Sequence, residues 1–416
     1  NVGGNLNVST IAANSSAITL AIDGRYEMVR ENFGANTGAI RIYGCDRVNR
    51  GFEFDGTVFV PINSGVSPDA PNHVIVHKNH LFFAFGGSAQ HSGVGSPYVF
   101  NAISGAAELA TGDTITGFMT EPGSNNDGAL GIYNRNTVHI LYGTSVIDWN
   151  LVRFRDELGA FPHTLQQLGQ TMYLDDRGLM TFKTVQAYGN FQQATESRHV
   201  QRYINSKKTG SQASCIVRDK NQYRLFFSDK TSIYVTTEGT KIVGIMPVVF
   251  TDTVECIASL EKLNGAEEIM FGSSDGKVYH LDKGTSFDGD KIEAYLKTPF
   301  NFSRSIRSQK RYLGITLEAS GTGYAEFNFT TELGYNATDI SQPANQSSTL
   351  ELREVNWDTF VWDAFIWDGT TLGPSNLKLE GSSENISLVI RKNSDYFAPI
   401  NISGALIRFA HRRSLR

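Results

Sequence analysis

Hydrophobic and polar residues alternate in short runs along most of the chain. This alternation is typical of a half-buried β-strand, whose successive side chains point to opposite faces. Clear examples are residues 39–62, 73–85, 130–143 and 215–237, where a short polar turn separates two runs. Turns such as Asp-Lys-Asn and Asp-Asp-Arg-Gly favour hairpins. The sequence therefore predicts an all-β protein built from successive hairpins.

The hairpin units recur irregularly, at about 45 residues on average, which is the blade period of a β-propeller. A small twisted sheet cannot bury both of its faces alone, whereas a radial array of such sheets can. We therefore predict an irregular β-propeller over residues 1–289, with five or six blades. The best candidates for helices are residues 161–170 and 190–208. In the second, Val200 and Ile204 have the i, i+4 spacing of one helix face.

The pattern changes from Lys291 onward, where six strand-like runs follow one another and a seventh is possible. Their alternation again indicates half-buried strands. We predict a separate C-terminal β-sandwich over residues 290–416. The runs are residues 291–302, 311–319, 323–331, 348–355, 386–393 and 402–410, with 375–381 as the possible seventh.

An aromatic ribbon, NWDTFVWDAFIWDG, lies inside the predicted sandwich at residues 356–369. Its Trp-Asp pairs recur every five residues, which excludes the WD repeat of about 40–45 residues. On one continuous strand, Trp357 and Trp367 would lie on one face and Trp362 on the other. Phe360 and Phe365 would add to both faces. An ordinary core is one explanation, and a subunit contact is the other, since buried aromatics anchor interfaces. The candidate interface residues are Trp357, Phe360, Trp362, Phe365 and Trp367.

The length and composition agree with this organisation. A chain of 416 residues is long enough for two domains, and its 40 glycines against 11 prolines fit many short strands and turns. The formal net charge of −5 argues against a global attraction for nucleic acid. Three cysteines far apart in sequence, Cys45, Cys215 and Cys256, indicate no disulfide framework. No signal peptide is visible, and no apolar run approaches the ~18 residues of a membrane span.

Two basic stretches run against the negative net charge. Each is either a solvated sheet edge or a contact to an acidic partner or to DNA phosphate. The candidate contact residues are Arg304, Arg307, Lys310 and Arg311 in the first stretch, and Arg408, Arg412, Arg413 and Arg416 in the second.

Templates for catalysis do not fit the sequence. The Gly-x-Ser-x-Gly elbow, the phosphate-binding loop and the Cys-based redox pair are missing. His73 and His77 would lie ~13 Å apart on a strand, too far to share a zinc ion. We expect no catalytic residue, no cofactor and no metal, and we predict that the protein is not an enzyme.

Residues 138–182 show a more specific pattern. A strand ends in a Gly-Thr-Ser turn, a DWNL strand follows, and the segment closes with the MYLDDRGLMTF hairpin. This segment resembles the propeller-bearing tail proteins of tailed bacteriophages, such as the hub, nozzle or DNA-stabilisation proteins of short-tailed phages. The KRYLGITLEASGTG strand and the aromatic ribbon are similar to the sandwich that follows the propeller in those proteins.

The resemblance implies a virion structural protein that is assembled in the host cytoplasm. Copies would form a homo-oligomeric ring below the portal and contact the portal, an adaptor or other tail proteins. The ring would line the conduit for DNA retention and ejection, through which double-stranded DNA passes transiently. Two alternatives are a carbohydrate-binding or glycan-cleaving β-propeller of a viral spike or secreted protein, and a cellular scaffold propeller.

Overall fold

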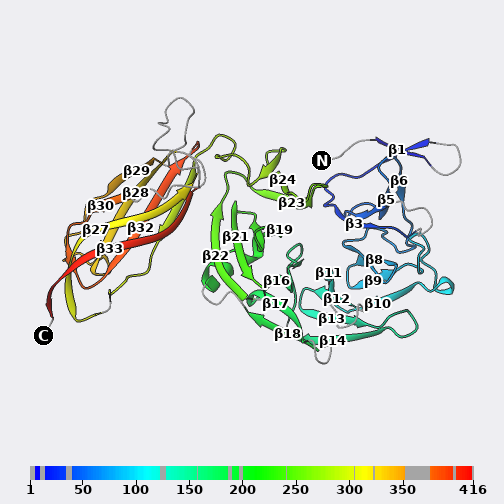
Figure 1. Cartoon of the computed structure of the whole chain (residues 1–416). Coiled ribbons are helices and arrows are strands. Elements are labelled where there is room, and N and C mark those ends of the chain that lie inside the picture. The colour runs from blue at the N-terminus through cyan, green and yellow to red at the C-terminus, as the bar shows by residue number, and fades with distance from the viewer. Residues whose placement is uncertain are drawn as a thin grey trace. The chain divides into compact units, whose positions relative to one another are not determined.

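The structure is a computed structural model, and strands dominate it (Figure 1). The chain divides into two compact units, Asn1–Leu281 and Asp282–Arg416. Among the described residues, the only α-helix is α1 (Gln201–Lys207). The protein is thus mostly β, as its sequence predicts. The structure describes residues 5–9, 15–33, 40–121, 128–156, 158–185, 190–195, 200–239, 241–303, 305–321, 324–351, 375–396 and 400–414.

The described part of the first unit contains a hairpin, β1 (Asn5–Ser9) and β2 (Ser15–Thr19), followed by six antiparallel sheets. Every strand of these sheets pairs only with its neighbours in sequence, so each sheet is a simple meander. In chain order the sheets are β3–β6 (Glu27–Glu31, Arg41–Cys45, Phe52–Phe54, Phe59–Pro61), β7–β10 (Val74–His77, His80–Phe85, Ser88–His91, Ala107–Ala110), β11–β14 (Ile115–Glu121, Ala129–Asn134, Thr137–Tyr142, Asn150–Asp156), β15–β18 (Gln166–Gln167, Thr171–Asp175, Gly178–Val185, Asn190–Thr195), β19–β22 (Ser211–Val217, Gln222–Phe227, Thr231–Glu238, Lys241–Val249) and β23–β25 (Val254–Glu261, Glu267–Ser273, Val278–Leu281).

The predicted hairpin turns are confirmed. Lys78 and Asn79 join β7 to β8, and both have positive φ angles, 47° and 62°. Two successive left-handed residues form the type I′ turn, whose twist matches that of the flanking strands. The Asp-Asp-Arg-Gly turn joins β16 to β17, and Asp175 pairs with Gly178. Local turn chemistry therefore sets the register of these two hairpins.

Apolar clusters lie between consecutive sheets and connect them. One cluster joins Phe82 and Ala84 of the second sheet to Leu130 and Ile132 of the third. Equivalent clusters connect the first sheet with the second, the third with the fourth, and the fourth with the fifth. Phe250 bridges the fifth and sixth sheets, with ring centroids 5.6 Å from Phe226 and 5.9 Å from Phe271. Each sheet therefore depends on its neighbours for burial.

The first strands of the six sheets also lie side by side. Strand β3 contacts β7, β7 contacts β11, and β15 and β23 both contact β19. The amide of Gln167 in β15 donates a 3.1 Å hydrogen bond to the Thr120 carbonyl of β11. These contacts connect all six first strands into one continuous series.

The first predicted helix, residues 161–170, was wrong, and the second, residues 190–208, was wrong in extent. Residues 161–170 form turns and the short strand β15, and residues 190–195 form strand β18, which pairs with β17. Sheet pairing outweighs the weak helical pattern there. Only residues 201–207 form helix α1, whose Ile204 is buried in the cluster between the fourth and fifth sheets.

The described part of the second unit contains two antiparallel sheets. All six predicted strand runs, and the possible seventh, contain strands. The first sheet has the order β26 (Ile292–Lys297), β32 (Ile386–Ser394), β28 (Tyr324–Leu333) and β29 (Gln346–Glu351). The second has β27 (Ser308–Gly321) at its centre, with β30 (Ser375–Lys378), β31 (Ser382–Ser383) and β33 (Ile400–Ser414) paired to it.

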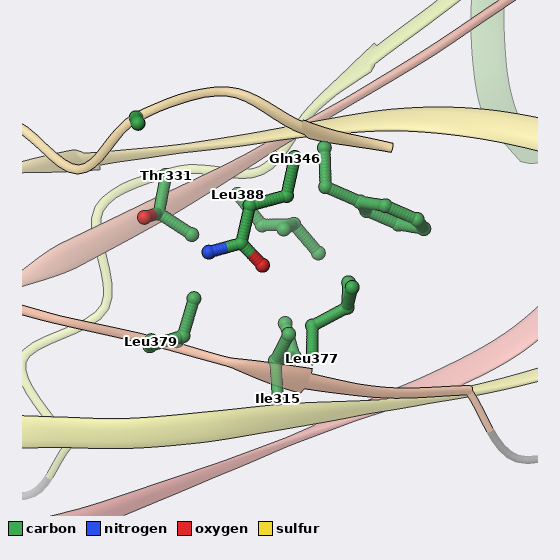
Figure 2. Close-up of a pocket in the computed structure, with 8 residues that line it drawn as sticks. Ile315, Thr331, Gln346, Leu377, Leu379 and Leu388 are labelled. Atoms are coloured by element: carbon green, nitrogen blue, oxygen red, sulfur yellow. The ribbon is translucent and has the colours of Figure 1, made fainter. Parts of the chain in front are cut away.

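Side chains from both sheets share one core. Ile315 and Leu377 from one sheet and Phe329 and Leu388 from the other belong to the same buried cluster. Figure 2 shows Ile315 and Leu377 on one side of a small cavity and Leu388 on the other, and Phe329 also lines this cavity. The cavity measures about 10 Å³, which is close to the minimum that holds one water molecule. The two sheets therefore pack tightly at this level.

A buried carboxyl group also lies in the first unit, between the third and fourth sheets. The Glu121 side chain accepts hydrogen bonds from the Tyr133 hydroxyl (2.5 Å) and the Thr171 hydroxyl (2.6 Å). Burial raises the pKa of Glu121 from 4.5 to about 7, although both hydroxyls oppose this shift.

The inter-sheet clusters predict a large loss of stability from one truncation. Phe82→Ala should lower the free energy of unfolding by about 3–5 kcal/mol, because Phe82 is fully buried between two sheets. Denaturant unfolding measures this loss. The control is Ile103→Ala at a fully exposed position, which should change stability by less than about 0.5 kcal/mol. Equal effects of the two variants would contradict the packing described here.

The Glu121 carboxyl predicts a pH dependence of stability. The folded state binds the proton of the Glu121 carboxyl more tightly than the unfolded chain does. The resulting contribution to the free energy of unfolding is complete below pH 4.5 and is lost as the pH rises through about 7. The loss is about 3 kcal/mol, since one pKa unit corresponds to ~1.4 kcal/mol. Unfolding at several pH values should show this slope in the wild type and not in Glu121→Gln. An identical pH profile for both proteins would refute the assignment.

Candidate functional site

The two basic stretches, about 100 residues apart in sequence, meet in one sheet. Strands β27 and β33 are antiparallel partners, so Arg311 faces Ala410 and Gly314 faces Arg408. Residues directly opposite each other lie on the same face, and so do residues two apart on a strand. Arg311 and Arg408 therefore share the outward face of this sheet.

The arginines of this face are exposed and held in defined positions. Arg412 is the extra residue of a β-bulge, and its Nη1 lies 3.4 Å from the Ser382 hydroxyl of β31. The Arg408 guanidinium approaches to 3.0 Å from the point where a Cβ atom on Gly314 would lie. Glycine at that position thus lets the guanidinium lie close over the sheet. Arg307, in the turn before β27, is also exposed.

We call Arg307, Arg311, Arg408 and Arg412 the arginine surface. Within the described residues, none of the four guanidiniums lies within ion-pair distance of a carboxylate. The hydrogen bond and the charge of Lys378 lower the pKa of Glu380, and the charge of Arg311 adds to this effect. The Glu380 carboxylate forms its ion pair with the Lys378 ammonium, 3.0 Å away. Within the part of the chain described, the arginine surface is therefore positive and forms no ion pair.

Lys310 does not belong to this surface, which corrects the sequence prediction. The residue is fully buried, and its ammonium donates hydrogen bonds to the carbonyls of Ser305 (2.6 Å), Ser308 (3.1 Å) and Glu384 (2.9 Å). Its pKa is lowered by burial. Alternation along β27 places residue 310 inward and residue 311 outward. Lys310 therefore bonds to backbone carbonyls at the ends of neighbouring segments and does not face solvent.

Several predicted site residues lie outside what the structure describes. The whole aromatic ribbon, with Trp357, Phe360, Trp362, Phe365 and Trp367, falls there, as do Arg304 and Arg416. Arg413 is described only in its backbone, where it pairs with Gln309. The subunit-contact prediction for the ribbon therefore stays a prediction.

A polar cluster in the first unit was missed by the sequence analysis. His73 Nδ1 lies 2.7 Å from Glu27 Oε2, and the His73 ring is 5.7 Å from the His163 ring. Arg25, just before β3, donates from Nη2 to the Gln212 carbonyl of β19. Contacts within this cluster therefore join the first, second, fourth and fifth sheets.

Burial is the main cause of the charge state of His163 in this cluster, and neighbouring arginines add to it. Arg47 Nη2 lies 2.9 Å from His163 Nε2. Burial, together with the charges of Arg25, Arg47 and His73, lowers the pKa of His163 to about 2. The ring is therefore neutral, and its Nε2 accepts a hydrogen bond from Arg47. His163 has a φ of 60°, and this left-handed backbone aims the ring at the cluster.

No local motif marks the members of this cluster, because they come from four loops and strands distant in sequence. The structure separates His73 from His77, the two histidines that the sequence analysis considered for a zinc ion. His73 points into the cluster, whereas His77 and His80 face each other across the β7–β8 turn. Among the described residues, no group of three or more His, Cys, Asp or Glu side chains could hold a metal ion. None of the described helices is long and apolar enough to cross a membrane.

Comparisons with known structures give remote similarities. No protein-family model and no curated protein matches this sequence. Two solved structures of BBS1N in complex with ARL6DN, soaked with mercury or lead, match at TM-scores of 0.41 and 0.42. They share 12% and 10% identity, over 62% of this chain and 77% and 78% of theirs. Raptor of Chaetomium thermophilum matches at a TM-score of 0.36 and 10% identity, over 51% of this chain and 19% of its own. None of these matches relates to phage tails.

Proposed function

We propose that the first unit is an irregular β-propeller and the second a β-sandwich. Six successive meanders, apolar clusters between neighbouring sheets and side-by-side first strands support the propeller. The hydrogen bond from Arg25 to Gln212 joins the start of this unit to its fifth sheet, so the series of sheets turns back toward its beginning. Two sheets that share one buried cluster support the sandwich.

We propose that the protein is a non-enzymatic structural component that assembles with further protein chains. The observation that carries this proposal is the exposed outer strand β22, nine residues long, at the edge of the fifth sheet. Val243, Met246 and Val249 on this strand are exposed by 53%, 53% and 64%. A long apolar edge invites pairing, so proteins that stay monomeric usually shorten, charge or cover such an edge.

The assembly that we propose is the ring of a phage tail. The resemblance of residues 138–182 to propeller-bearing tail proteins suggests this setting, in which copies surround the path of DNA below the portal. A ring needs a rigid wall and repeated contacts between copies, and stacked sheets with exposed edges supply both. The protein would then reside in the virion tail and contact its own copies and neighbouring tail proteins.

Charged substitutions on β22 test the assembly. Met246→Glu and Val249→Glu should leave the unfolding temperature within a few degrees of the wild type, because both side chains face solvent. Both should shift the mass of the purified assembly toward the monomer, as measured by sedimentation or native mass spectrometry. The matched control is Leu263→Glu, the same type of change at a fully exposed position in the turn between β23 and β24.

Three results would count against this proposal. A wild-type protein that stays monomeric at high concentration, in the presence of the other tail proteins, would exclude the ring. Purified virions of the parent phage without this chain would exclude the tail. Equal assembly defects in Leu263→Glu and Met246→Glu would show that β22 is not the specific contact.

A further inference from the structure

We infer that the arginine surface of the second unit binds the phosphate backbone of nucleic acid. The inference deepens the proposed function and rests on it for its biological setting, although the binding itself can be measured separately. The residues of this surface lie on β27, β33 and the turn before β27, all within the second unit.

The positive charge of this surface favours the binding of an anion. Four exposed guanidiniums gather on and beside two paired strands, and the described residues supply them with no ion-paired carboxylate. The chain as a whole carries a net charge of −5, so this concentration of positive charge runs against its average. Clustered cations without ion-pair partners are the electrostatic footprint of a polyanion site.

The chemistry of the four groups favours phosphate. All are arginines, whose planar guanidinium presents paired N–H donors that match phosphate oxygens. Arg408 is held close over Gly314, and Arg412 lies beside Ser382, so at least these two donors are pre-positioned. A rigid sheet face loses less side-chain entropy on binding than a flexible loop would.

The geometry of β33 disfavours the main alternative, in which an acidic strand of another protein pairs with this edge. Three register shifts interrupt the pairing of β27 with β33, and two of them place an extra residue, Ser403 or Arg412, on β33. Bulges and edge charges twist and blunt a strand against edge-to-edge pairing. The surface therefore fits a contact made through side chains, without sequence readout.

Salt dependence provides the test. Full-length protein should bind a fluorescent random-sequence DNA duplex, with anisotropy as the readout. If four phosphates are neutralised, log K should fall against log salt with a slope of about −3.6, which is roughly 100-fold between 50 and 200 mM salt. The double variant Arg408→Gln/Arg412→Gln should reduce the slope to about −1.8.

Two controls separate the surface from general effects. Lys283→Gln/Lys291→Gln removes the same net charge from exposed positions of the same unit, outside β27 and β33, and should leave the slope unchanged. Leu406→Ser removes an apolar side chain, 65% exposed, from the same strand. This change should not alter DNA binding, whereas an interface with a protein would be weakened by it.

The outcomes distinguish this inference from the proposed function. DNA binding that is absent, insensitive to salt or reduced equally by the lysine control would overturn the inference. The inference would also be overturned if the protein bound no DNA and if Leu406→Ser and Arg408→Gln/Arg412→Gln both lost binding to a protein partner. The mass of the assembly, measured on the same variants, should stay that of the wild type. If the β22 variants did not change the assembly but the protein still bound DNA, the proposed ring would be wrong and the inferred DNA-binding surface would still hold.

Discussion

The structure of the first unit depends on burial between small sheets. A sheet of three or four short strands has two faces and too little area to form a core alone. The apolar clusters supply the missing core, because large side chains such as Tyr133 and Phe182 fill the space between neighbouring sheets. Where the series ends, in the sixth sheet, Met270 and Val278 remain 37% and 73% exposed. The same packing that stabilises the interior thus leaves apolar surface at its margin.

Buried polar groups add specificity to this packing at a cost in solvation. Glu121 connects β11 to β12 and β16 through two hydroxyls, and it fits only when the third and fourth sheets meet in one register. The His163 ring stays neutral between arginines and therefore avoids placing a third cation among them. Such groups penalise alternative arrangements of the sheets, since an unsatisfied buried polar atom costs about 1–3 kcal/mol.

The second unit separates its inward and outward chemistry residue by residue. Lys310 and Tyr312 point inward and are buried, whereas Arg311 between them faces solvent. One strand can therefore stabilise the core and present a cation. The arginine surface arises because β33 returns beside β27 at the end of the chain. An assembly that encloses DNA would need such local contacts to be few, since many clustered cations would hold the duplex too tightly.

Local sequence determined the strands, the Lys78-Asn79 and Asp-Asp-Arg-Gly turns and the mostly β class, because alternation and turn chemistry act over a few residues. It also identified both basic stretches. Only the tertiary structure decided that these stretches are neighbours, that Lys310 is buried and Arg311 exposed, and that residues 190–195 pair as a strand. The cluster of Arg25, His73 and His163 likewise became visible only in the fold. Pairing between distant segments depends on the burial of the whole unit, and no local pattern encodes it.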